Sequence, residues 1–426
     1  MTSAYDIRQF RPGSAADGAA DDATTGWISA TTLGFHSAEL TQEHMGKMAA
    51  VYAENDWTLT GAYAESAPKG AWPVTHPVAT YASFRRNLNV GGNQVLAHLI
   101  AGVTVRANHR RRGLLRTIIE ADLRTAASDG VAIAALYAAE ASIYGRFGFG
   151  PATETRKVHL NTGAGFRLDH TATGSVDVAD RESLARVAPD VFDRYHAQTL
   201  GSIERQTFSA GSIAGLWSDW NPEPDPKVRS LLHYGADGDI DGYVAYKAKS
   251  WDVVPPTLSV IEFIALTRDA WAELWQHLAS IDLIQRIEVE NAPLADPLAW
   301  TLDDPRRYKV VGGEDGVWLR ILDVVAALTA RSYETDGEIT VQVTDPQGIA
   351  SGRYRLAVRG GKPDVTTTTT APEITLDISA LSSLYLGGPS AITLARAGRV
   401  AGSPDAVATL THLLRHDIEP YCATHF

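Results

Sequence analysis

The sequence predicts two α/β units of similar order followed by an α+β region. Three observations support this. Residues 95–137 have the pattern of strand, turn, helix and strand, residues 181–290 repeat a similar order, and residues 318–414 give strands followed by helices. A chain of 426 residues is too long for one hydrophobic core. We therefore place domains at residues 1–160, 161–303 and 304–426.

Ahead of the first crossover, apolar periodicity predicts short strands and two helices. A loop rich in Gly, Ala, Ser and Asp is expected over residues 12–25. The sheet of this unit should be mostly antiparallel, with its functional crossover at residues 95–137. The expected elements before that crossover are, in order, 5–10 (strand), 27–35 and 41–54 (helices), and 57–64 and 78–87 (strands).

The crossover carries a glycine turn inside a run of arginines. Residues 95–105 are rich in aliphatic and β-branched residues and predict a strand, and Leu115, Ile119 and Leu123 recur at helical spacing. The first N–H groups of a helix lack intrahelical partners, and the helix dipole adds partial positive charge there. Gly113 lets an anion approach the backbone closely. The turn is thus suited to a phosphate or pyrophosphate, although a solvated basic helix start would have the same composition.

The spacing Arg-x-x-Gly-x at residues 110–114, or one register later, resembles the acyl-CoA-binding motif of the Gcn5-related N-acetyltransferases (GNATs). A strand follows at residues 130–137, and then Tyr144 and Phe-Gly-Phe at residues 147–149. Together with His-Arg-Arg-Arg-Gly-Leu-Leu-Arg at residues 109–116, this order resembles the Eis (enhanced intracellular survival) acetyltransferase family. The resemblance implies two GNAT-like domains and a C-terminal domain like the sterol carrier proteins. It extends, more loosely, to the last residue.

The resemblance also implies acetyl-CoA as the cosubstrate, bound by the first domain alone. Backbone N–H groups of the turn would face the diphosphate, and a strand edge would hold the pantetheine as an added half-strand. Arg110, Arg111 or Arg112 would add charge-assisted hydrogen bonds. The positions implied to line the coenzyme are Val103, Thr104, Val105, Arg111, Arg112, Gly113, Leu114, Leu115, Arg116, Ala139 and Glu140.

Tyr144 and Phe426 are the implied catalytic residues for transfer to an amine. A phenol has an ordinary pKa of about 10 and a thiol about 8.5, so Tyr144 can hydrogen-bond or donate to the leaving sulfur. By residue type alone, the expectation for Tyr144 is a packing residue beside Phe147 and Phe149, and the motif context reverses that expectation. The resemblance assigns the base to the α-carboxylate of Phe426, a weak base that would act through water. Without the resemblance, a frayed terminus is the expectation.

The acceptor side departs from the family pattern. Aminoglycoside-acetylating relatives have acidic residues at the positions of Ser37 and His425 here, and a His and a Ser at Tyr137 and Ala139. We therefore expect a reshaped, less acidic acceptor pocket, which puts aminoglycoside use in doubt; nearby Glu39 and Glu43 could substitute. Aromatic residues that could line it, with core packing as the alternative, are Trp27, Phe35, Trp57 and Phe84.

The second unit lacks the glycine turn. Residues 266–270 contain no arginine cluster and place Asp269 where an anion would sit, so this unit resembles a degenerate GNAT domain without a coenzyme site. An unrelated α/β domain is the alternative. In the third unit, strands are expected between residues 318 and 376 and helices at 378–386, 391–396 and 404–414.

Composition narrows the class of protein. The formal net charge of −12 disfavours nonspecific nucleic-acid binding and favours amine partners. One cysteine, Cys422, leaves no internal disulfide, and we expect no metal site, signal peptide or membrane span. The expectation is a cytoplasmic N-acetyltransferase acting on a small-molecule amine, with a homohexamer (dimer of trimers) implied by the resemblance. A non-catalytic acyl-CoA- or lipid-binding protein is the alternative.

Overall fold

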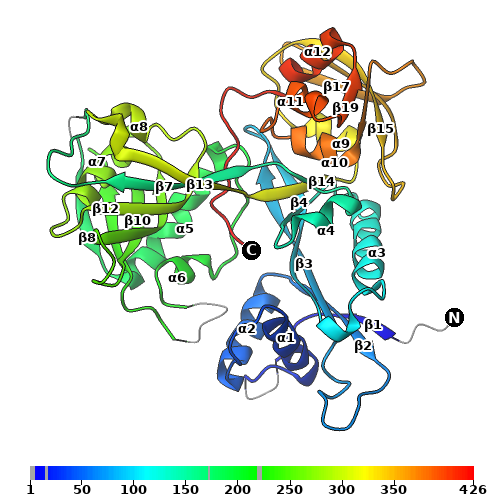
Figure 1. Cartoon of the computed structure of the whole chain (residues 1–426), viewed down its shortest axis with the longest axis horizontal. Coiled ribbons are helices and arrows are strands. Elements are labelled where there is room, and N and C mark those ends of the chain that lie inside the picture. Colours follow the sequence, from blue (N-terminus) through cyan, green and yellow to red (C-terminus); the bar gives the residue numbers. More distant parts are fainter. Residues whose placement is uncertain (1–4, 15–17, 171–172, 218–222) are drawn as a thin grey trace.

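The computed structural model describes residues 5–14, 18–170, 173–217 and 223–426 (Figure 1). It contains three mixed sheets flanked by helices, which confirms the predicted fold class. In the order of hydrogen-bonded neighbours, the first sheet is formed by β1 (Tyr5–Phe10), β2 (Thr58–Ala64), β3 (Ala79–Asn89), β4 (Gln94–Val105), β5 (Ile133–Tyr137), β14 (Val317–Ile321) and β6 (Gly150–Pro151).

Helices of the first domain cover both faces of this sheet. α3 (Leu114–Ser128) packs Ile119 and Leu123 onto one face, and both side chains are fully buried. α1 (Asp22–Gly34), α2 (Gln42–Glu54) and the short α4 (Ala141–Tyr144) complete the domain. α1 begins inside the expected loop, because Asp21 accepts a hydrogen bond from the Thr24 N–H at 2.7 Å and caps the helix. Residues 15–17 of that loop lie outside the described chain.

The second sheet repeats the order of the first. Its strands are, in sheet order, β13 (Tyr308–Asp315), β7 (Glu154–Asn161), β12 (Arg286–Pro293), β11 (Thr257–Ala265), β10 (Ile240–Ala248), β9 (Arg229–Tyr234) and β8 (Ser175–Ala179). Its helices are α5 (Arg181–Gln198), α6 (Ser209–Ile213), α7 (Arg268–Ala279) and α8 (Leu298–Thr301).

The third sheet follows in the C-terminal domain. Its strand order is β17 (Lys362–Thr367), β16 (Gly352–Arg359), β15 (Gly337–Thr344), β18 (Ile374–Asp377) and β19 (Val400–Gly402). The helices here are α9 (Val324–Ala330), α10 (Ile378–Leu384), α11 (Ala391–Arg396) and α12 (Pro404–Leu414). Within the described part of the chain, no helix has the length and apolar character needed to cross a bilayer.

The chain crosses between domains at strands rather than at loops. β7 ends near the predicted boundary at residue 160, yet it is a strand of the second sheet. β14, which the sequence places at the start of the third unit, lies between β5 and β6 of the first sheet. After α12, the C-terminal segment (red) leaves the third domain and ends between the first two domains (Figure 1).

A buried ion pair fastens the third domain to the first sheet. Arg320 of β14 donates from Nε to the Phe147 carbonyl at 2.9 Å and from Nη2 to Asp345 Oδ2 at 2.6 Å. The two charged side chains are 0% and 1% exposed. Burial alone would raise the pKa of Asp345, but Arg320 and the Ala350 N–H outweigh it and hold the pKa below its usual range. The carboxylate is therefore ionised near neutral pH.

Replacing Asp345 leaves the buried guanidinium without its counter-charge. We expect Asp345→Asn to lower the free energy of unfolding by ~3 kcal/mol at neutral pH. Because the folded-state pKa is depressed, this stability is present above the unfolded pKa of about 3.9 and is lost as the pH falls through the folded value. Urea titration at neutral pH and at about pH 3 should therefore show the two proteins converging in acid.

The matched control is Asp364→Asn, which breaks an exposed pair with Arg355 at 3.0 Å. It should cost less than ~1 kcal/mol. Equal losses in both variants would contradict a special role for the buried pair.

Candidate active site

A wedge opens in the first sheet where two parallel strands separate. β4 and β5 pair from Ala97↔Ile133 to Ile100↔Leu136. Beyond that point β4 continues along β3, and β5 continues along β14. In the described chain, no strand pairs with the β5-facing edge of β4 after Ile100. An extended ligand with amide groups can add there as a half-strand.

The wedge is shaped by a bulge at Gly102. The register between β3 and β4 shifts here, and Gly102 has a φ of +60°. A Cβ atom at this position would lie 2.7 Å from the Trp27 indole. Glycine is therefore needed for both the backbone conformation and the close approach of α1.

The turn before α3 presents free backbone N–H groups, which suit an anion. Arg111 and Gly113 both have positive φ, +63° and +81°. Within the described residues, the amide N–H groups of residues 111–116 have no hydrogen-bond acceptor. A Cβ built on Gly113 meets nothing within 4 Å, so the backbone is open to a ligand. These donors and the dipole of α3 point to the same space.

The arginines of the turn differ in their contacts. Arg110 Nε donates to the Val105 carbonyl at 3.3 Å, and Arg112 donates to Tyr5 Oη at 2.8 Å and to the Asn108 carbonyl at 3.2 Å. Arg111 and Arg116 are exposed and form no hydrogen bond or ion pair with the rest of the described chain. Arg110 and Arg112 thus brace the turn, and the other two are available to a diphosphate. The sequence alone did not separate these roles.

A cavity of about 1050 Å³ lies beside the wedge, between the first two domains. Its walls include α1, the separated ends of β4 and β5, and parts of β11, β12 and α7. Tyr421 and residues 423–426 of the C-terminal segment form another wall. The cavity is at the upper end of the size range of small-molecule sites and has room for more than one small substituent.

Tyr144 lies in this cavity at the end of α4. Its side chain is 6% exposed, and its hydroxyl has no hydrogen-bond partner among the described residues. Burial first, and then the negative charge of Glu140, raise the pKa of Tyr144 to about 12. The phenol is therefore a free, protonated donor at neutral pH.

Phe426 also lines this cavity, and contacts of the C-terminal segment hold it in place. The Tyr137 hydroxyl donates to the Thr424 carbonyl at 2.7 Å, and Thr424 Oγ1 donates to the Ile203 carbonyl at 2.6 Å. The Phe426 ring packs edge-on against Tyr137 and Phe84, with centroids 5.2 and 5.9 Å apart. The terminal carboxylate forms no ion pair with any described residue. This segment is ordered by hydrogen bonds to both domains.

The other predicted coenzyme positions fall into three groups. Val103 and Ala139 line the cavity. Thr104 shares a hydrogen bond of 2.7 Å with Thr80, and Glu140 is exposed just before α4. The side chains of the remaining three pack with the core of the first domain, so only their backbone is left for a ligand; these are Val105, Leu114 and Leu115.

The predicted acceptor residues also reach the cavity. Ser37 and His425 line it, as do Trp27, Phe35 and Trp57, whereas Phe84 packs between the Trp57 and Phe426 rings. Glu43 instead pairs with Lys47 at 2.8 Å on the exposed face of α2.

The cavity is also lined by carboxylates that the sequence analysis did not identify as site residues. Glu262 pairs with Arg205, and Glu314 pairs with Lys157 at 2.6 Å. In the described chain Asp296 and Asp315 form no ion pair, although Tyr308 donates to Asp296 at 3.0 Å and the Trp318 indole donates to Asp315. Burial raises the pKa of Asp296 despite that hydrogen bond. Apart from Arg205 the cavity is lined by no lysine or arginine of the described chain, so it favours a cationic ligand; the lining carboxylates are Glu262, Asp296, Glu314 and Asp315.

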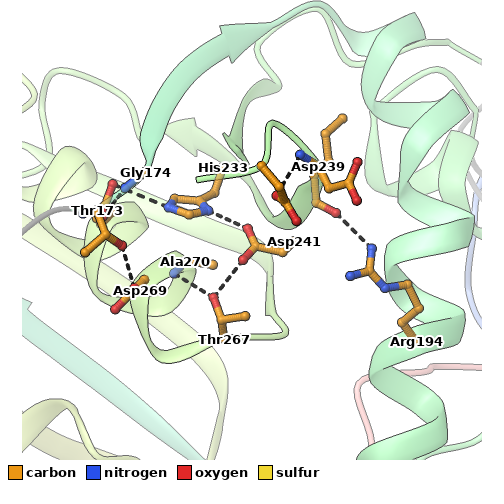
Figure 2. Close-up of polar contacts among 12 residues, drawn as sticks. Thr173, Gly174, Arg194, His233, Asp239, Asp241, Thr267, Asp269 and Ala270 are labelled. Carbon is orange, nitrogen blue, oxygen red and sulfur yellow. Dashed lines mark hydrogen bonds and ion pairs between the residues drawn. The ribbon is translucent and has the colours of Figure 1, made fainter. Parts of the chain in front are cut away.

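The corresponding turn of the second domain is closed by its own side chains. Figure 2 shows Thr267 at the start of α7, where it accepts from the Ala270 N–H at 3.1 Å and donates to Asp241 at 2.8 Å. Asp269, in the first turn, accepts from Thr173. His233, fully buried, contacts Asp241 on its other side. Negative charge and a filled cap leave no place for a diphosphate at α7.

Comparison with known proteins agrees with this architecture. Models of the GNAT acetyltransferase domain match residues 19–152 and 212–321, and a sterol carrier protein domain model matches residues 324–423. The solved structure of Eis1 from Mycobacterium abscessus superposes with a TM-score of 0.78 at 27% identity, covering 99% of this chain and 100% of Eis1. A GCN5-related N-acetyltransferase from Anabaena variabilis, 18% identical, has the same fold with a TM-score of 0.80 over 99% of this chain and 100% of that protein.

Sequence relatives identify the family. An N-acetyltransferase of Streptomyces avermitilis is 35% identical over 419 residues, which is 96% of this chain and 97% of that protein. The N-acetyltransferase Eis of Mycobacterium tuberculosis (strain CDC 1551 / Oshkosh) is 34% identical over 344 residues, 78% of this chain and 81% of Eis. GNAT domains use acyl-CoA donors, and the chain is an N-acetyltransferase that belongs to the Eis family.

Proposed function

We propose that this protein transfers an acetyl group from acetyl-CoA directly to a primary amine. The observation that carries the proposal is the cavity itself. The cavity is lined by the free phenol of Tyr144, the terminal residue Phe426 and the unpaired end of β4, the strand that leads along the chain to the open turn at Gly113. Acetyl transfer requires groups that hold the coenzyme, accept a proton from the amine and stabilise the departing thiolate, and these are groups of those three kinds.

In this mechanism the diphosphate binds the N–H groups of residues 111–116, with Arg111 and Arg116 adding charge. The pantetheine lies along β4 and carries the thioester to the end of the wedge. The amine nitrogen attacks the thioester carbon and forms a C–N bond, and the Phe426 carboxylate accepts the nitrogen's proton through water. The C–S bond then breaks, and Tyr144 stabilises the departing sulfur.

The pKa values define what Tyr144 does. A thiol has a pKa of about 8.5, and the pKa of Tyr144 is about 12. Complete proton transfer from the phenol to the thiolate is therefore unfavourable. A hydrogen bond from the phenol to the developing thiolate is the form that stabilises the transition state.

The acceptor is a cationic amine, and aminoglycosides belong to the class to be tested. The second-domain carboxylates Asp296 and Asp315 support a cationic ligand, whereas Ser37 and His425 supply no negative charge. Burial also lowers the pKa of His425, which keeps its ring neutral at pH 7.

A homohexamer (a dimer of trimers) in the cytoplasm is part of this proposal, and light scattering in solution would measure the assembly.

The test is release of free coenzyme A from acetyl-CoA in the presence of aminoglycosides, arylalkylamines, alkylamines or lysine peptides. We expect at least one amine class to give thiol release together with an acetylated product by mass spectrometry. A protein that binds coenzyme A but acetylates none of these amines would instead be a binding protein.

Gly113→Ala is a control for the binding turn. An alanine must adopt a left-handed conformation there, which costs about 1–2 kcal/mol, so affinity for coenzyme A should fall about fivefold or more by calorimetry. Unchanged affinity would place the coenzyme elsewhere.

A further inference from the structure

The second sheet keeps a wedge of the same kind as the catalytic one. β11 and β12 pair in parallel from Thr257↔Arg286 to Val260↔Val289. Beyond that point β11 continues along β10, and β12 continues along β7. Ile261 is bulged out of the β10–β11 ladder, since Ala245 pairs with Glu262 and Tyr246 with Val260. The separation of the two strands is thus preserved although the diphosphate turn is not.

This second wedge is apolar and opens into the catalytic cavity. The cavity is lined there by Ile261 and Phe263 of β11, Trp271 and Trp275 of α7, and Val289 of β12. Phe263 and Trp275 stack with centroids 4.7 Å apart and planes 16° apart. Ile261 is 37% exposed, so the surface is available to a ligand. The wedge is therefore continuous with the space around Tyr144 and Phe426.

The occupant of the wedge has to enter from the catalytic end. α7 has no free N-terminal turn, because Thr267, Asp241 and Asp269 fill it (Figure 2). A second coenzyme therefore has no diphosphate site here. A molecule in the wedge must therefore be a substrate whose reacting group lies beside Tyr144 and Phe426.

Charge identifies which substrate that is. Asp296 and Asp315 accept hydrogen bonds from Tyr308 and Trp318 but form no ion pair with any described residue. They line the same cavity, and their negative charge opposes an anionic tail. An ammonium group satisfies them, and an apolar body fits the aromatic wall beyond. An amine acceptor can combine an ammonium group with an apolar body, whereas the acetyl-CoA donor carries an anionic diphosphate.

We propose that the second wedge is the subsite for the acceptor's apolar body. Its substrates would be amines with an extended alkyl or aryl tail, lying against Ile261, Phe263 and Trp271. The inference rests on the proposed function, because the amine must be the acceptor. In this way the domain that lost the coenzyme site acts in acceptor selection.

The test uses a series of linear primary alkylamines from ethylamine to decylamine. We expect kcat/KM to rise about three- to fourfold for each added methylene until the wedge is filled, as burial of a CH₂ predicts. Trp271→Ala should lower kcat/KM for octylamine at least tenfold and leave that for ethylamine unchanged.

Two further variants keep the test independent of folding. Ile261→Trp fills the wedge from a partly exposed position and should likewise reject long amines while retaining short ones. Trp300→Ala removes a side chain that is 90% exposed and outside the cavity. It should leave kcat/KM unchanged for both long and short amines. The dissociation constant for acetyl-CoA should be the same in all four proteins.

The outcomes separate the two proposals. If short amines are acetylated but tail length has no effect, or if the wedge variants respond to acyl-chain length of the donor instead, the subsite inference is wrong. If no amine releases thiol from acetyl-CoA while coenzyme still binds, the proposed function fails first.

Discussion

Extending the chain by two residues beyond Phe426 should lower kcat for amine acetylation by about 10³-fold. The α-carboxylate then becomes a peptide carbonyl, which cannot accept the proton of the attacking nitrogen. The Phe426 ring is held against Tyr137 and Phe84, and Thr424 is hydrogen-bonded on both sides, so the new carboxylate cannot take the old place. Steady-state thiol release with a saturating amine measures the loss.

The controls distinguish a base from a structural tail. Phe426→Leu keeps the carboxylate and should retain kcat within about tenfold, since an apolar side chain still fills the pocket. Coenzyme A affinity should be unchanged in the extended protein, because the Gly113 turn is untouched. Full activity in the extended protein would exclude the terminal base, and lost coenzyme binding would show a structural defect instead.

The features that the sequence predicts for the turn before α3 are local ones. A left-handed glycine, N–H groups at a helix start and neighbouring arginines are all within residues 110–116. The role of each arginine in that run, however, depends on contacts that only the folded chain makes. Tyr5 and Asn108 engage Arg112, and the Val105 carbonyl engages Arg110, so only the folded chain shows that Arg111 and Arg116 remain available.

The acceptor side could not be predicted in the same way. Its walls join segments more than 100 residues apart in sequence, such as Trp57 with Gln206, whose side chains form a buried hydrogen bond of 2.9 Å. Asp296 and Asp315 belong to short loops and strand ends with no motif of their own. The repeated order of elements in the second unit was the available signal, because it placed a parallel strand pair where a wedge could open.

The pairing of β14 likewise could not be predicted from local sequence. Its residues predict a strand, but nothing in residues 317–321 indicates which sheet receives it. Pairing with β5, from Val317↔Tyr137 to Ile321↔Ile133, depends on a partner about 180 residues earlier, and the Arg320–Asp345 pair then fixes the third domain beside it. Strand existence is set locally, whereas strand pairing is set by burial across domains.

Tyr144→Phe should lower kcat about 10²- to 10³-fold and leave coenzyme A affinity unchanged. The variant loses only the hydroxyl, which has no partner among the described residues, so folding should be preserved. Burial and Glu140 raise the pKa of Tyr144 to about 12, and the group is a donor only while protonated. Its contribution should thus be constant from about pH 6 to 10 and be lost only as the pH approaches 12.

The decisive measurement is the ratio of wild-type to Tyr144→Phe kcat across that pH range. A constant ratio supports a hydrogen bond from a neutral phenol to the leaving sulfur, and a ratio that falls from pH 7 to 9 would require a donor with a lower pKa. Tyr63→Phe is the matched control, since Tyr63 is a buried tyrosine of the same sheet outside the cavity and should retain full kcat. A thioester with a more acidic thiol should also narrow the gap between Tyr144→Phe and the wild type, because its sulfur needs less stabilisation as it departs.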